Sequence, residues 1–139
     1  LDEGLIHSVA VGTMESAATR MKELLAENMQ FDAVLAFDDI MAIGVKRALN
    51  EAGRRIPDDV ALVGFDNIEL STLPEISLTT VDIPKYELGR VSAQLVIERI
   101  EEAAEGKGDD TTLTRPFKEI VLNPTLIKRA STMGGYAVP

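Results

Sequence analysis

The sequence predicts an α/β fold: a doubly wound, mainly parallel sheet flanked by helices. Two short and almost wholly apolar runs, AVLAF at 33–37 and VALVGF at 60–65, are typical of parallel strands buried on both faces. Between them, residues 40–52 carry apolar side chains at helical spacing. Each run ends in an aspartate, Asp38 and Asp66. A strand–helix–strand order therefore brings two carboxylates to one sheet edge, where open α/β sheets bind ligands.

The other elements of the N-terminal half follow from local signals. We expect residues 6–11 (IHSVAV) to form a short strand. Thr13 is placed to cap an amphipathic helix at 14–28, whose apolar residues recur every three or four positions. In the helix between the two apolar strands, Asp39 is the expected N-cap and Gly53 the expected C-terminal stop.

The C-terminal half alternates loops with less regular elements. Residues 66–77 form a loop that is unusually rich in leucine and isoleucine, and 78–81 (LTTV) form a brief strand. Pro84 precedes the longest predicted helix, 86–104. A polar link at 107–114, a strand at 117–122 and a loose tail at 133–139 complete the prediction.

Composition limits the classes of function. The 139 residues suffice for one domain with a core, and 14 basic against 23 acidic residues give a net charge of −9, unfavourable for direct contact with nucleic acid. Cysteine is absent, which excludes thiolate metal sites and disulfides. No apolar run approaches the ~18 residues of a membrane-spanning helix. The chain has neither an initiator methionine nor a signal peptide, so we interpret it as a piece of a longer protein.

The residues alone leave several interpretations of the aspartates open. A carboxylate can accept hydrogen bonds from adjacent hydroxyls of a sugar or nucleoside, but aspartate also commonly opens turns. Asp38, Asp39 and Asp66 could instead bind Mg²⁺, as in phosphoryl-accepting receiver domains, with Lys85 as a loose candidate for the required lysine. His7 is the single histidine and has no partner pattern typical of catalysis.

Three longer stretches carry a resemblance to a known family. The runs AFDDIMAIGVKRALNEAGRRIPDDVALVGFDN, LTTVDIPKYELGR and VLNPTLIKRAST contain, in order, D-x-M-A-x-G, V-G-[FY]-D, T-T-V and P-x-L-x-x-R-x-S-T. Together they resemble the lactose-repressor/galactose-repressor (LacI/GalR) family of bacterial transcription regulators, over roughly residues 9–132. The resemblance implies a two-lobed, type I periplasmic-binding-protein-like core, of which this chain matches the C-terminal part.

The resemblance also implies a division of the chain. Residues 1–82 correspond to the C-terminal lobe, and 83–108 to a crossover and a helix that packs on an N-terminal lobe outside this sequence. Residues 109–132 correspond to a return strand and C-terminal segment, and 133–139 to the tail.

The ligand-binding residues are likewise implied by the family pattern. Asp66 matches the carboxylate that holds the ligand, and Asp38 matches a position that faces it, with Phe37 beside them. Ile83 stands where many relatives place a glutamine, and Gly12 where several place a stacking aromatic, so a more apolar or differently shaped ligand is expected. A dimer contact between C-terminal lobes is implied for Ile43, Leu70, Leu73, Pro74 and Ile76, with local packing under the loop as the alternative.

The implied function is the effector-sensing and dimerising portion of a LacI-type regulator. It would bind a sugar or nucleoside-like effector, form a homodimer, and reach operator DNA only through a helix-turn-helix outside this sequence. It would be cytoplasmic, without enzymatic activity, cofactor, metal or membrane contact. The alternative is part of a periplasmic sugar-binding protein of an uptake system, although the IKRAST block favours the regulator.

Overall fold

A computed structural model describes residues 2–104 and 118–133. The chain divides into two compact units, one formed by Leu1–Asp82 with Thr125–Pro139 and the other by Ile83–Pro124. The candidate edge lies in the first.

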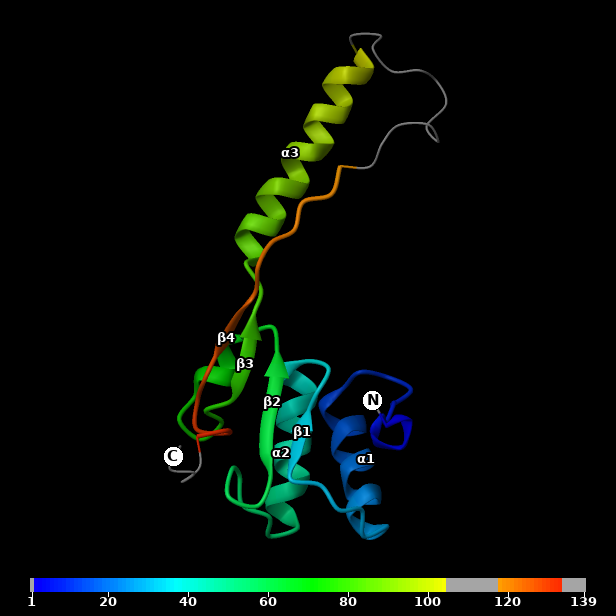
Figure 1. Ribbon diagram of the computed structural model, residues 1–139, viewed down its shortest axis with the longest axis vertical. Coiled ribbons are helices and arrows are strands. Elements are labelled where there is room, and N and C mark those ends of the chain that lie inside the picture. Colours follow the sequence, from blue (N-terminus) through cyan, green and yellow to red (C-terminus); the bar gives the residue numbers. More distant parts are fainter. Residues whose placement is uncertain (1, 105–117, 134–139) are drawn as a thin grey trace. The chain divides into compact units, whose positions relative to one another are not determined.

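The first unit contains a four-stranded sheet in the order β1-β2-β3-β4 (Figure 1). β1 (Ala33–Leu35), β2 (Ala61–Phe65) and β3 (Thr79–Asp82) are parallel neighbours, and β4 (Thr125–Ile127) runs antiparallel beside β3. The predicted α/β class with a mainly parallel sheet flanked by helices is confirmed.

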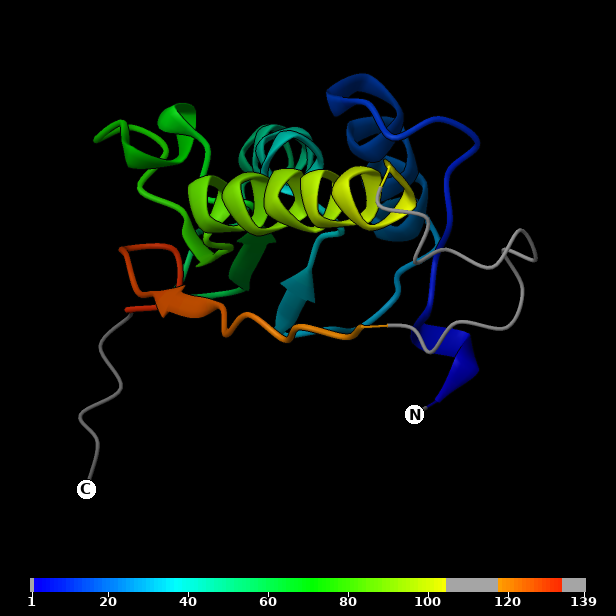
Figure 2. The ribbon, with the colours of Figure 1, turned by 90° about the horizontal axis from the view of Figure 1, so that it is seen from above.

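Two helices lie on one face of this sheet (Figure 2). α1 (Met14–Ala26) begins at Thr13, which forms a capping box with Ser16, as its N-terminal signal predicts. α2 (Asp39–Glu51) connects β1 to β2. Two short 3₁₀ helices, η1 (Glu3–Leu5) and η2 (Glu69–Thr72), lie in the connecting segments.

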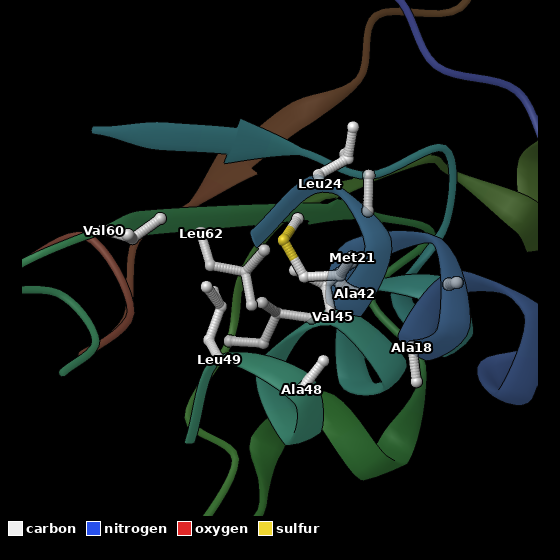
Figure 3. Packing of buried hydrophobic residues seen from close by; sticks show 12 residues of the cluster. Ala18, Met21, Leu24, Ala42, Val45, Ala48, Leu49, Val60 and Leu62 are labelled. Carbon is white, nitrogen blue, oxygen red and sulfur yellow. The ribbon is translucent and has the colours of Figure 1, made fainter. Parts of the chain in front are cut away.

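The hydrophobic core is formed where the two helices meet each other and the sheet. Figure 3 shows Met21 of α1, Val45 of α2 and Leu62 of β2 gathered in this cluster. The helices approach closely at Gly44, where a Cβ atom would overlap the main-chain carbonyl of Met14. Glycine is therefore required at this contact because it has no side chain.

Two predictions for the N-terminal half are wrong. Residues 6–11 form no strand, and Ile6 and Val11 are exposed. β1 is an edge strand rather than a buried central one: Leu35 is 74% exposed and Phe37, just beyond the strand, is 84% exposed. An apolar run predicts a strand that could be buried on both faces, but α1 and α2 lie on one face of the sheet, and Leu35 of β1 stays exposed.

The return strand is also displaced from its predicted position. Residues 118–122 form no strand, and residue 117 lies outside the described residues. β4 begins instead at Thr125, because its pairing with β3 fixes the register, with Ile127 opposite Thr80. The predicted polar link at 107–114 and all of the tail except Met133 lie outside the described residues.

The second unit is built on α3 (Lys85–Ala104), close to the predicted helix 86–104. No side chain of α3 is buried among the described residues, and its exposed apolar residues include Leu88, Val96, Ile97 and Ile100. Its packing against another lobe stays a prediction. Across residues 2–104 and 118–133, no helix combines the length and apolar character needed to cross a membrane.

The contact at Gly44 can be tested by substitution. Alanine favours helix over glycine by about 1 kcal/mol, but the Met14 carbonyl belongs to the backbone and cannot rotate away. We therefore expect Gly44→Ala to lower the free energy of unfolding by about 1–3 kcal/mol, as overpacking does. Urea unfolding followed by circular dichroism measures this. Asn50→Ala, on the exposed side of α2, should change it by less than about 0.5 kcal/mol.

Candidate functional site

The candidate site is the edge of the sheet where the three parallel strands end. β1 leads into Phe37 and Asp38, β2 into Asp66, and β3 ends at Asp82. Because the strands are parallel, their carboxyl ends share one edge. The sheet therefore brings three acidic strand ends to the same side, of which the order of elements predicts Asp38 and Asp66.

Asp38 is the N-cap of α2, a role that the sequence pattern predicts for Asp39. Its backbone is extended (φ −144°, ψ 175°), and its Oδ1 accepts a hydrogen bond from the Met41 N–H at 2.7 Å. The prediction that Asp39 caps this helix is thus wrong by one residue. The cap occupies one carboxyl oxygen of Asp38, and its second oxygen can accept from a ligand hydroxyl.

Asp39 is fully buried (0% exposed) at the start of α2. Its Oδ1 accepts from the Thr80 hydroxyl at 2.6 Å, and its Oδ2 from the Ile68 N–H at 2.9 Å. The neighbouring β2 residue is Gly64, where a Cβ would overlap Oδ1 of Asp39. Asp39 therefore connects α2, β3 and the loop after β2, and its role is structural.

Asp66 adopts an unusual backbone conformation at the end of β2. Its φ is +103°, and that of the next residue, Asn67, is +49°. Positive φ is sterically unfavourable for residues other than glycine, and such strain costs on the order of 1–3 kcal/mol. The Asp66 N–H donates to the Val81 carbonyl at 2.9 Å, which fixes this half-buried residue to β3.

A polar network surrounds Asn67. Its N–H donates to the Thr80 hydroxyl at 3.2 Å, and its Nδ2 to Oδ1 of Asp82, also at 3.2 Å. Arg129, from the segment after β4, donates to Oδ1 of Asn67 at 2.7 Å. The same guanidinium donates to the Ser71 hydroxyl at 3.1 Å and the Leu78 carbonyl at 2.7 Å.

Asn67, Thr80 and Arg129 are not among the site residues predicted from the sequence. A signal was present in the strand LTTV, because its buried threonines need hydrogen-bond partners. Their partners, however, lie up to 53 residues away in sequence: Thr79 hydrogen-bonds the main chain of Arg129 and the hydroxyl of Thr132. Sequence spacing cannot identify such pairs.

The remaining predicted ligand residues occupy different surroundings. Phe37 is a largely exposed ring beyond β1. Gly12 is exposed, and a Cβ there would lie 3.6 Å from the sulfur of Met41, in the first turn of α2. Ile83 follows β3 directly and begins the second unit, where its carbonyl accepts from the Lys85 N–H at 2.7 Å.

The alternative Mg²⁺ site lacks its third carboxylate. Both oxygens of Asp39 accept protein hydrogen bonds in a buried position. Within residues 2–104 and 118–133, no group of three or more histidine, cysteine, aspartate or glutamate side chains is arranged to bind a metal ion.

His7 lies beside Arg20, with 3.4 Å between its Nδ1 and the guanidinium.

The residues predicted for a dimer contact differ in exposure. Leu70 is 42% exposed and Pro74 is exposed, whereas Ile43 and Leu73 are half-buried. Ile76 packs partly against the hydrophobic core, which agrees with the alternative of local packing for this one residue.

The role of Asp39 leads to a test of stability. In Asp39→Asn, an amide N–H₂ replaces one of two oxygens that both accept hydrogen bonds, so either Thr80 or Ile68 loses its acceptor. We expect the free energy of unfolding to fall by about 1–3 kcal/mol. Thermal and urea unfolding measure it. Asp32→Asn, at an exposed aspartate, should have an effect below about 0.5 kcal/mol, and an equal loss in both variants would contradict this role.

Comparison with known proteins places this arrangement in a family. Residues 3–132 match the periplasmic binding protein-like domain. The chain is 35% identical over 111 residues to the ribose operon repressor of Escherichia coli K12, covering 80% of this chain and 31% of that protein. The chain thus spans about a third of the length of this curated relative.

Two solved structures share the fold. A LacI-family transcriptional regulator from Sanguibacter keddieii superposes with a TM-score of 0.83 at 32% identity, over 96% of this chain and 48% of the other. The transcriptional regulator CelR in complex with cellobiose gives a TM-score of 0.77 at 35% identity, over 94% and 37%. With the family match over most of its length, this chain belongs to the periplasmic binding protein-like family, as part of the effector-binding domain of a LacI-family transcriptional regulator.

Proposed function

We propose that this chain senses a sugar at the carboxyl edge of its sheet and thereby controls DNA binding by a domain outside this sequence. The observation that carries the proposal is the strained conformation of Asp66 at that edge. Unfavourable backbone conformations persist where the surroundings enforce them, and they cluster at ligand-binding sites.

The chemistry of the edge suits a sugar. The carboxylate of Asp66 can accept hydrogen bonds from sugar hydroxyls, and Asp38 offers the oxygen that does not cap α2. The exposed ring of Phe37 provides an apolar surface for ring C–H groups, the mixture of apolar and polar groups that small-ligand sites use. CelR, with a similar fold, is in complex with cellobiose, and the E. coli relative is a ribose operon repressor.

The proposed output is a change in affinity for operator DNA. A domain of this family is not an enzyme, so the bound effector acts by favouring one arrangement of the protein over another. Such coupling is typically worth about 1–3 kcal/mol. The net charge of −9 makes this chain itself a poor phosphate-binding surface, so DNA contact is assigned to a separate helix-turn-helix.

The proposal is tested on the whole regulator that contains this chain, because the chain spans only about a third of the length of its curated relative. Calorimetry with ribose, cellobiose and lactose identifies the sugar that binds. Asp66→Asn should then raise the dissociation constant about 10- to 100-fold, because it removes hydrogen bonds to a charged acceptor. Asp32→Asn makes the same change of charge just before β1, at the amino end of this strand and so away from the candidate edge. It should leave binding unchanged.

Operator binding measured with fluorescent DNA completes this test. The sugar should change the affinity of the unsubstituted regulator for operator DNA, and the Asp66→Asn variant should need correspondingly more sugar for the same effect. Equal sugar affinity in the Asp66→Asn variant and the unsubstituted protein would disprove the ligand role of Asp66. No binding of any of the three sugars would contradict the choice of ligand class.

We also propose that the regulator forms a homodimer through the loop that follows Asp66. The support is an apolar loop surface, with Leu70 partly exposed and Pro74 exposed, close in sequence to the ligand edge. A dimer contact there would connect effector binding in one subunit to its partner.

Leu70→Glu tests the dimer surface, because it places a charge in the middle of a proposed apolar contact. We expect self-association to weaken about tenfold or more, as loss of a central interface side chain does. Sedimentation velocity over a range of concentrations measures it. Leu5→Glu, at a more exposed leucine outside the loop, is the control. A dimer that is equally stable in both variants would assign Leu70 to local packing.

A further inference from the structure

We propose that Arg129 is a positioning residue for Asp66, acting through Asn67. In this role Arg129 does not touch the effector. It fixes the residue after Asp66 and so determines where the Asp66 carboxylate is presented. The inference rests on the proposed function, in which Asp66 contacts a sugar, and it identifies what aligns that contact.

The contacts of Arg129 span the whole loop between β2 and β3. Its guanidinium donates to Oδ1 of Asn67 at the start of the loop, to the Ser71 hydroxyl in the middle, and to the Leu78 carbonyl at the end. Its own N–H donates to the Thr79 hydroxyl at 2.8 Å, which holds Arg129 against β3. One side chain therefore fixes three points of the loop from a segment more than 50 residues further along the chain.

Asn67 transmits this constraint to Asp66. Its side-chain oxygen is held by Arg129, its side-chain nitrogen donates to Asp82, and its backbone N–H donates to Thr80. The Asp66 N–H is held separately by the Val81 carbonyl. The backbone on both sides of the Asp66 carboxylate is thus fixed, which explains how two consecutive positive φ angles are maintained.

An arginine suits this position better than a lysine. The guanidinium is planar and presents several N–H groups in a fixed fork, so it can reach acceptors in different directions at once. The three acceptors here are uncharged, and each is a fixed part of the loop. A lysine ammonium on a flexible stem cannot hold all three in one geometry.

The first test measures local opening in the whole regulator and needs no ligand. Hydrogen–deuterium exchange is compared for the peptide covering residues 66–72 in the unsubstituted protein, Arg129→Gln, Arg129→Lys and Asn67→Ala. We expect exchange in this peptide to accelerate about tenfold or more in Arg129→Gln and Asn67→Ala, and less in Arg129→Lys. Peptides from α1 should be unchanged.

The matched control is Thr132→Val. It removes the hydrogen bond between the Thr132 and Thr79 hydroxyls (2.7 Å) from the same C-terminal segment, without touching Asn67. If Thr132→Val accelerates exchange at 66–72 as much as Arg129→Gln does, Arg129 contributes only to the general stability of the segment, and the inference is overturned.

The second test is a double-mutant cycle on affinity for the sugar that binds among ribose, cellobiose and lactose. Arg129→Gln should raise the dissociation constant about tenfold in the unsubstituted protein but less than about twofold in the Asn67→Ala variant, because both changes break the same connection. Equal effects of Arg129→Gln in the two backgrounds would overturn the route through Asn67.

The two proposals fail in different ways. If a sugar binds and Asp66→Asn weakens it, but Arg129→Gln changes neither affinity nor exchange, the proposed function stands and the positioning role is wrong. If none of the three sugars binds while exchange at 66–72 accelerates as expected, Arg129 does hold Asp66, and the choice of sugar as the effector is wrong.

Discussion

The buried carboxylate of Asp39 is the interaction on which the candidate edge depends. A buried carboxyl group is costly unless its oxygens accept hydrogen bonds, and both do, from Thr80 of β3 and from the N–H of Ile68. Because Asp39 begins α2, these bonds join a helix, a strand and a loop at one point. Gly64 leaves the space that this carboxylate needs in β2. The strained Asp66 lies two residues before Ile68, so the strain is maintained next to this junction.

Features that depend on local pattern were predictable from the sequence. The helical spacing of residues 40–52 and the capping signal at Thr13 gave helices close to those observed. The order strand–helix–strand predicted parallel pairing of β1 and β2, and hence a shared edge for Asp38 and Asp66. Each of these features is determined within about 30 residues, by backbone geometry and the burial of one apolar face.

Features that depend on distant partners were not predictable. The cap of α2 differs by one residue because two consecutive aspartates offer the same chemistry, and the one that turns inward is held by distant partners, Thr80 and Ile68. The return strand lies at β4 rather than 117–122 because pairing with β3 sets its register. Ser131 also holds the segment after β4 against the sheet: its hydroxyl donates to the Leu62 carbonyl of β2 and accepts from the Thr79 N–H of β3. Neither contact has a local signal.

The motifs that identify the family are mainly structural, and this explains why they do not identify the effector. In V-G-[FY]-D the glycine makes room for Asp39, in T-T-V a threonine holds Asp39 and Asn67, and in the last motif the arginine and serine fix the loop and β2. In the proposed function, the final aspartate of V-G-[FY]-D is the motif residue that contacts the ligand. In the proposed function, specificity would then depend on residues outside these motifs, such as Gly12 and Phe37. A shared framework can therefore hold the same carboxylate in regulators of different sugars, while a few variable side chains around it select which sugar binds.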